Sequence, residues 1–87
     1  MEIIYLPKAE NDLENWIKNG NKSILKKITT LTIAIIENPF EGIGKPEALK
    51  YNLVGKWSRR ITNEHRYVYA ILNETLYVYS LKGHCFD

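Results

Sequence analysis

Residues 38–69 read NPFEGIGKPEALKYNLVGKWSRRITNEHRYVY, and this stretch predicts the sheet around which the protein folds. A loop rich in glycine and proline precedes two runs of alternating side chains, which a polar turn at Asn63 and Glu64 separates. Such alternation is typical of strands, and strands joined by a short turn are antiparallel. We therefore expect two adjacent strands to display Arg60 and Arg66, while Arg59 points to the opposite face.

The rest of the chain predicts an α+β fold with its helices on one face of the sheet. Apolar residues recur at helical spacing over about 7–19 and again over about 21–37, so the two helices form a hairpin. Strand-like runs occupy residues 2–6, 51–54, 57–61, 65–72 and 75–81, with a tight turn expected at Asn73-Glu74. The prediction is a short N-terminal strand, the helix hairpin and then an antiparallel sheet, within one domain spanning residues 1–87.

Positive charge is concentrated in one part of the chain. Between Lys45 and Arg66 there are six basic and two acidic side chains, although the net charge of the whole protein is only +2. A solvated charged face is one explanation for such a cluster. Because these cations alternate along strands and are interleaved with aromatic residues, we favour a surface that binds phosphate groups.

Composition and motifs exclude several other classes of protein. The single cysteine, Cys85, cannot form an internal disulfide, which favours the cytoplasm, and no apolar run is long enough to span a bilayer. The loop glycines do not form a nucleotide-binding motif. His65, His84 and Cys85 lack the spacing of a zinc site. We therefore expect no cofactor, no metal and no membrane association.

A few residues could support RNA cleavage, which requires a base for the 2′-hydroxyl, cations for the phosphate and an acid for the leaving oxygen. Glu47 is the candidate base because basic side chains surround it in the sequence, although it could be an ordinary surface residue. Arg60 and Arg66 suit a phosphate, or alternatively a cross-strand salt bridge. Histidine is a residue type that can donate a proton near neutral pH, so His84 is a candidate acid, or it is simply an exposed histidine. We expect His65 to hold the Asn63-Glu64 turn by hydrogen bonding.

Three motifs resemble the YoeB/Txe toxins of the RelE superfamily. They are PFEGIGKPEALK at residues 39–50, NLVGKWSRRITNEHRYVY at residues 52–69, and Gly83-His84 near the C-terminus. The resemblance implies a RelE-like fold and a ribosome-dependent mRNA endoribonuclease, the toxin of a toxin–antitoxin pair. It further implies cleavage of A-site mRNA on the ribosome, neutralisation by a cognate antitoxin of the YefM/Axe type, and often a homodimer.

The same resemblance implies individual roles within the site. Glu47 corresponds to the proposed general base of the family, Arg66 to its catalytic arginine, and His84 to its C-terminal histidine, a candidate general acid. Arg60 corresponds to a neighbouring arginine of that site, and Lys50 to another basic position near the phosphate. For Lys50, a role in solubility is the alternative.

The tail departs from the family pattern, which usually ends in His-Tyr. This chain instead ends His84-Cys85-Phe86-Asp87, so Cys85 stands where a tyrosine would contact substrate. Either Phe86 takes over that contact after a shift of one residue, or the enzyme is weaker. The alternative function is therefore a catalytically impaired module that binds ribosome and antitoxin without efficient cleavage. A plain RNA-binding domain is a third hypothesis, disfavoured by a glutamate within the basic cluster.

Overall fold

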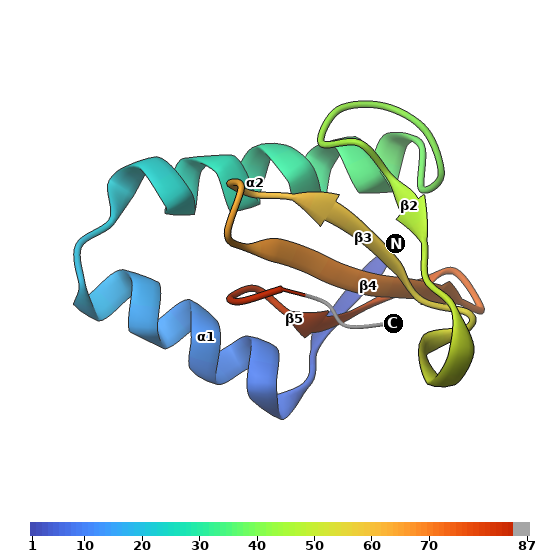
Figure 1. The fold of residues 1–87 in the computed structure, drawn as a ribbon, viewed down its shortest axis with the longest axis horizontal. Coiled ribbons are helices and arrows are strands. Elements are labelled where there is room, and N and C mark those ends of the chain that lie inside the picture. Colours follow the sequence, from blue (N-terminus) through green and yellow to red (C-terminus); the bar gives the residue numbers. More distant parts are fainter. Residues whose placement is uncertain (85–87) are drawn as a thin grey trace.

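The computed structural model describes residues 1–84, and both helices lie where the apolar spacing predicts them (Figure 1). Helix α1 spans Pro7–Lys18 and begins with a proline, whose missing N–H is not needed in the first turn. Helix α2 spans Lys22–Glu37, and the side chain of Asn21 caps its start by accepting the Ile24 N–H at 3.1 Å. No helix among these residues is both long and apolar enough to cross a membrane.

The predicted α+β fold is confirmed: the strands that follow the helices pair antiparallel, and the N-terminal strand joins them in parallel, so the five-stranded sheet is mixed. Its strands are β1 (Glu2–Tyr5), β2 (Glu47–Ala48), β3 (Trp57–Arg60), β4 (Arg66–Leu72) and β5 (Thr75–Ser80). The order across the sheet is β1-β5-β4-β3-β2; neighbours are antiparallel except β1, which pairs parallel with β5. Parallel pairing needs a long connection, and the chain between β1 and β5, which includes both helices, provides it.

Two details differ from the sequence prediction. Residues Tyr51–Leu53 form a turn of 3-10 helix, η1, rather than a strand, and Tyr51 has a left-handed φ of 56° that a strand cannot accommodate. Conversely, Glu47 and Ala48 form the short strand β2 within the expected loop. The Asn73-Glu74 turn is confirmed, with φ values of 51° and 60° that match a type I′ hairpin turn.

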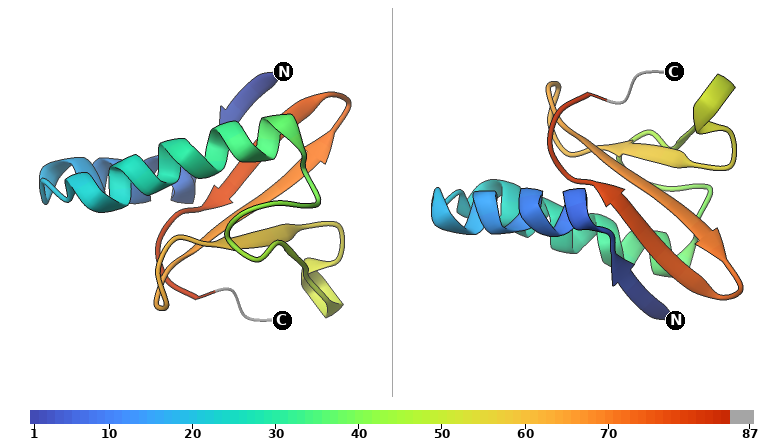
Figure 2. Two further views of the ribbon diagram at one scale, coloured as in Figure 1. Left: turned by 90° about the horizontal axis from the view of Figure 1, so that it is seen from above. Right: turned by 90° about the horizontal axis from the view of Figure 1, so that it is seen from below.

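Both helices lie on one face of the sheet, as the two views of Figure 2 show. The hydrophobic core fills the space between the helices and that face. Alternate residues of β4 and β5 point into it, and Tyr67, Tyr69, Leu76 and Val78 are fully buried against the apolar stripe of α2. The intervening residues, including Arg66, Ala70 and Tyr77, face away from the helices. This second face carries the candidate site.

Candidate functional site

A cavity of about 260 Å³ opens on the sheet face opposite the helices, where β2, β3 and β4 meet. It is lined by Lys45, Pro46, Glu47, Ser58, Arg60 and Arg66. The structure thus brings together three of the predicted site residues, the carboxylate of Glu47 and the guanidinium groups of Arg60 and Arg66. Lys45 adds a third cation from the loop.

The pairing of the strands explains why these side chains converge. Glu47 on β2 lies opposite Ser58 on β3, and Arg60 on β3 lies opposite Arg66 on β4. Directly opposed residues of antiparallel strands point to the same face, with their Cβ atoms about 4.5–5.5 Å apart. Ser58 and Arg60 are two positions apart on one strand and therefore also share that face.

The two arginines contribute differently to this cavity. Arg60 is exposed, and its guanidinium makes no hydrogen bond with residues 1–84. Nη1 of Arg66 donates to the carbonyl oxygens of Thr62 at 2.9 Å and Asn63 at 3.0 Å, so Arg66 also closes the turn between β3 and β4. Within the described chain neither arginine forms a salt bridge. Like charges directly opposite each other destabilise a sheet, so the pair suits a bound anion.

Arg59 anchors the loop that carries Glu47, a role that the sequence reading did not identify. Its side chain is fully buried on the helix face, which confirms the predicted direction. Nη2 donates to the carbonyl of Asn38 and also to the carbonyl of Glu41, the latter at 2.9 Å. Nη1 donates to the carbonyl of Ile43 at 3.2 Å. Because Asn38 caps the C-terminal end of α2, the guanidinium also lies at the negative end of the helix dipole.

The backbone at Gly44 completes the attachment of this loop to the sheet. Its carbonyl accepts the N–H of Arg60 at 2.7 Å, which fixes the loop three residues before Glu47. A Cβ on Gly44 would lie 2.8 Å from Leu31 and 3.1 Å from the Cβ of Arg59, and the residue has a φ of +82°. Only glycine both lacks the Cβ that would clash here and adopts this left-handed φ without strain. Arg59 and Gly44 therefore both attach the loop that leads into β2.

Contacts of Gly83 place the chain just before His84 beside β4. The N–H of Gly83 donates to Nδ1 of His65 at 2.9 Å, and its carbonyl accepts the N–H of Arg66, also at 2.9 Å. The His65 ring in turn packs edge-on against Trp16, with centroids 4.9 Å apart. His65 holds the Asn63-Glu64 turn, as predicted, through hydrogen bonds of its backbone to Ile61 and Thr62, and its side chain also tethers the C-terminal segment.

The remaining predicted residues lie outside the cavity lining or outside the described chain. His84 is exposed, and it directly follows the glycine that pairs with Arg66. Lys50 is also exposed and precedes η1, but it does not line the cavity. Cys85 and Phe86 lie outside the described residues. Within residues 1–84, no group of three or more His, Cys, Asp or Glu side chains could hold a metal ion.

Two buried tyrosines support the site from the helix side of the sheet. Burial raises the pKa of the Tyr67 hydroxyl well above its ordinary range, and Tyr67 shares a hydrogen bond of 2.7 Å with Thr32 of α2. Burial also raises the pKa of Tyr69, whose hydroxyl accepts from Nε of Arg59 at 3.2 Å and donates to the carbonyl of Pro39. Both hydroxyls therefore act as neutral structural groups, not as acids or bases.

Comparison with known proteins gives a consistent assignment. Residues 5–85 match the family described as the YoeB-like toxin of bacterial type II toxin-antitoxin system. The Toxin YoeB of a Synechocystis species is 51% identical over 69 residues, which are 79% of this chain and 80% of that protein.

Solved structures agree with the sequence matches. A YoeB/ParE toxin from Agrobacterium tumefaciens is 36% identical and superposes with a TM-score of 0.92 over 98% of this chain and all of that chain. A Staphylococcus aureus YoeB, solved both in a heterotetrameric complex with YefM and as a dimer, is 42% identical, with TM-scores of 0.89 and 0.90 over 98% of both chains. This protein therefore belongs to the YoeB-like toxins of bacterial type II toxin–antitoxin systems.

Proposed function

We propose that the protein is a ribosome-dependent endoribonuclease that cleaves A-site mRNA by attack of a ribose 2′-hydroxyl on the adjacent phosphorus. The observation that carries the proposal is the convergence of Glu47, Arg60 and Arg66 around one cavity on the open sheet face. A carboxylate among cations has an obvious use if a phosphodiester occupies the cavity. The cations bind the phosphate, and the carboxylate accepts the proton of the attacking hydroxyl.

Each step of this reaction has a candidate group. Glu47 takes the 2′-hydroxyl proton as the oxygen attacks phosphorus, and the guanidinium groups of Arg60 and Arg66 stabilise the extra negative charge that develops there. The bond from phosphorus to the 5′-oxygen then breaks, and His84 donates a proton to that leaving oxygen. The products are a 2′,3′-cyclic phosphate and a free 5′-hydroxyl. No step requires a metal or an organic cofactor.

The hydrogen bonds of the two arginines support different roles for them in binding the phosphate. Arg60 is free to move toward a phosphate, since it makes no hydrogen bond with the described residues. Arg66 is held by the turn carbonyls through Nη1, while its Nε and Nη2 atoms have no partner within residues 1–84. We infer that Arg66 is the fixed donor and Arg60 the mobile one. Cys85, Phe86 and Lys50 are proposed as further substrate contacts.

The proposed partners are a YefM-like antitoxin, the ribosome with its mRNA, and a second copy of this chain. Support for the antitoxin and for the homodimer comes from the S. aureus relative. An acidic and aliphatic antitoxin segment would cover the open sheet face and draw Arg60 and Arg66 away from RNA. These interactions, like the reaction itself, belong in the cytoplasm.

Primer extension on a translated message after induced expression tests this function. We expect new 5′ ends within codons of the message that appear only while it is translated. Growth arrest with intact mRNA would contradict the proposal and favour the impaired binding module. Cleavage of the same message without ribosomes would show that the nuclease activity does not depend on translation.

A further inference from the structure

The chain leaves the sheet shortly before the proposed acid, His84. Strand β5 ends at Ser80, and residues 81–83 lead from it to His84. Backbone groups beyond the end of a strand lose their ladder partners and must find others. Here, side chains of distant elements supply several of these partners. The rest of the fold therefore holds the segment 81–83 before the chain reaches His84.

Helix α1 binds both backbone polar groups of Leu81. Oδ2 of Asp12 accepts the N–H of Leu81 at 3.0 Å, and Nε1 of Trp16 donates to the Leu81 carbonyl at 2.9 Å. Asp12 and Trp16 are four positions apart, so they lie on the same face of the helix. Both side chains are buried. One turn of α1 thus fixes the backbone three residues before the proposed acid.

The carboxylate of Asp12 also has the partner that its burial requires. A buried charge is unfavourable unless it is paired. Nζ of Lys8 pairs with Oδ2 of Asp12 at 2.6 Å, and it also donates to the hydroxyl of Ser80 at 2.9 Å and to the carbonyl of Lys82 at 3.1 Å. These polar contacts go beyond what the packing of an apolar helix face requires. The first half of α1 is organised around the segment that follows β5.

His65 and Arg66 hold the peptide groups of Gly83. Nδ1 of His65 accepts the N–H of Gly83, and the Gly83 carbonyl accepts the N–H of Arg66, both at 2.9 Å. The His65 ring packs edge-on against Trp16, with centroids 4.9 Å apart, so the contacts at Leu81 and at Gly83 support each other. The residue before the proposed acid is thereby tied to an arginine that is proposed to bind the phosphate.

We propose that Asp12, Trp16 and His65, which we call the C-terminal clamp, are positioning residues that hold His84 in place to protonate the leaving oxygen. This inference rests on the proposed function, because the clamp serves the acid of that reaction. None of the three residues lines the candidate cavity. They act through the backbone of residues 81–83. Position matters because a displacement of about 1 Å can slow an enzyme about 10²-fold.

Two replacements of His65 separate its hydrogen bond from its packing. His65→Phe keeps an aromatic ring against Trp16 but offers no acceptor to the Gly83 N–H. His65→Asn loses the ring but keeps an acceptor, its side-chain oxygen. In single-turnover cleavage of mRNA on programmed ribosomes at saturating toxin, His65→Phe should be about 10-fold to 10²-fold slower than the wild type. His65→Asn should be faster than His65→Phe although it packs less well. Rates that instead follow the melting temperatures of the two variants would overturn the proposal.

A double-variant comparison tests whether His65 acts through His84. His84→Gln removes the proposed acid, so nothing remains for the clamp to position. His65→Phe should therefore slow the His84→Gln enzyme by less than about twofold, although it slows the wild type much more, as expected for coupled residues. Effects that multiply in the double variant would show that His65→Phe disturbs the whole site, and they would overturn the proposal.

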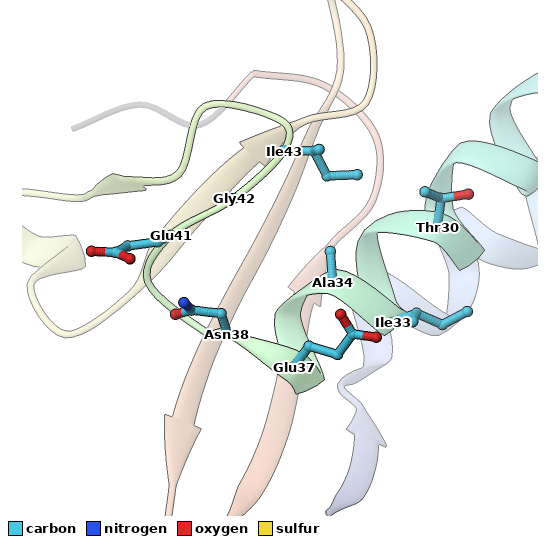
Figure 3. Close-up of a pocket in the computed structure, with 8 residues that line it drawn as sticks. All are labelled: Thr30, Ile33, Ala34, Glu37, Asn38, Glu41, Gly42 and Ile43. Atoms are coloured by element: carbon cyan, nitrogen blue, oxygen red, sulfur yellow. The ribbon is translucent and has the colours of Figure 1, made fainter.

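Ala34→Gly is the matched control for lost stability. Glycine weakens the middle of a helix, so this variant should melt at a lower temperature than the wild type. Ala34 lines a groove of about 520 Å³ beside the second half of α2, and none of the residues that line this groove belongs to the clamp or to the candidate cavity (Figure 3). Well below its melting temperature, Ala34→Gly should cleave at the wild-type rate. A rate as low as that of His65→Phe would show that lost stability alone explains the defect.

Amide hydrogen exchange of the purified toxin, followed by NMR, tests the clamp without RNA. The Gly83 amide should exchange slowly in the wild type and in His65→Asn, and much faster in His65→Phe. The Leu81 amide, which Asp12 binds, should stay protected in all three and is the internal control. A Gly83 amide that exchanges freely in the wild type would overturn the clamp even if the protein cleaves mRNA. A protected Gly83 amide in a protein that cleaves no mRNA would contradict the proposed function, and with it the catalytic purpose of the clamp.

Discussion

Replacement of Arg59 by methionine should destabilise the protein strongly, although no expected catalytic group is touched. Methionine preserves much of the buried hydrophobic volume but removes every donor that holds the loop. The carbonyls of Asn38, Glu41 and Ile43 then lose their partner, as does the Tyr69 hydroxyl. An unsatisfied buried polar group costs about 1–3 kcal/mol, and removal of one partner of a buried charged interaction about 3–5 kcal/mol.

We expect a loss near the low end of that range, about 3 kcal/mol, because the contacts to the loop carbonyls are only partly buried. For a domain of this size that loss lowers the melting temperature by roughly 12–24 °C, at about 4–8 °C per kcal/mol. It is also a large share of the roughly 4–13 kcal/mol expected for the whole chain at 0.05–0.15 kcal/mol per residue. The variant should nevertheless fold at low temperature.

Chemical denaturation of the wild type, Arg59→Met and Arg59→Lys measures this effect directly. Lysine keeps the positive charge but cannot reach several carbonyls with one planar group, so it should recover only part of the stability. Hydrogen exchange should show faster exchange in residues 38–46 of Arg59→Met below the melting temperature. If Arg59→Met changed the free energy of unfolding by less than about 0.5 kcal/mol, the level of ordinary surface substitutions, the anchoring role would be refuted.

Three other predictions concern the turn, the pH dependence and the tail. Glu74→Gly should stabilise the protein by about 0.5–1 kcal/mol, measured by denaturation. The left-handed φ of 60° costs a non-glycine residue about 1–2 kcal/mol, and glycine removes this strain. Part of the gain is offset because glycine loses more conformational entropy on folding. The contribution of Tyr67 to stability should be constant below about pH 9 and fall above the ordinary tyrosine pKa of about 10, because the raised pKa of this buried hydroxyl keeps its proton in the folded state while the unfolded chain releases it; Tyr67→Phe should flatten this fall in a series of thermal melts. Cys85→Tyr should speed single-turnover cleavage about 5-fold to 150-fold if base stacking of roughly 1–3 kcal/mol is restored; if Phe86 already stacks, Phe86→Ala should instead slow cleavage and Cys85→Tyr should change little.

Local patterns in the sequence predicted much of the fold. Apolar spacing located both helices, and alternation located β3, β4 and β5, because these elements depend on neighbouring residues. The same alternation correctly separated Arg59 from Arg60 and predicted that Arg60 and Arg66 share a face. The prediction of one domain over residues 1–87 stays a prediction.

The features that the sequence did not reveal depend on contacts between distant residues. The parallel pairing of β1 with β5 joins segments more than 70 positions apart, and no local signal encodes it. The same is true of the hydrogen bond from Gly83 to His65 and of the contacts that Arg59 makes with the loop. Tyr51 looked like the start of a strand because aromatic residues favour strands, but its left-handed backbone begins η1 instead.

The most direct test of the central claim is single-turnover cleavage of mRNA on programmed ribosomes by Glu47→Gln and by its control Glu41→Gln. Both residues are exposed glutamates of the same loop region, and only Glu47 lines the cavity. Glu47→Gln should bind ribosomes normally but cleave about 10² to 10⁴ times more slowly, the usual contribution of a general base, and wild-type products should carry a 2′,3′-cyclic phosphate. Glu41→Gln should cleave at the wild-type rate. Equal rates for Glu47→Gln and the wild type would contradict the assignment of Glu47 as the base of this site.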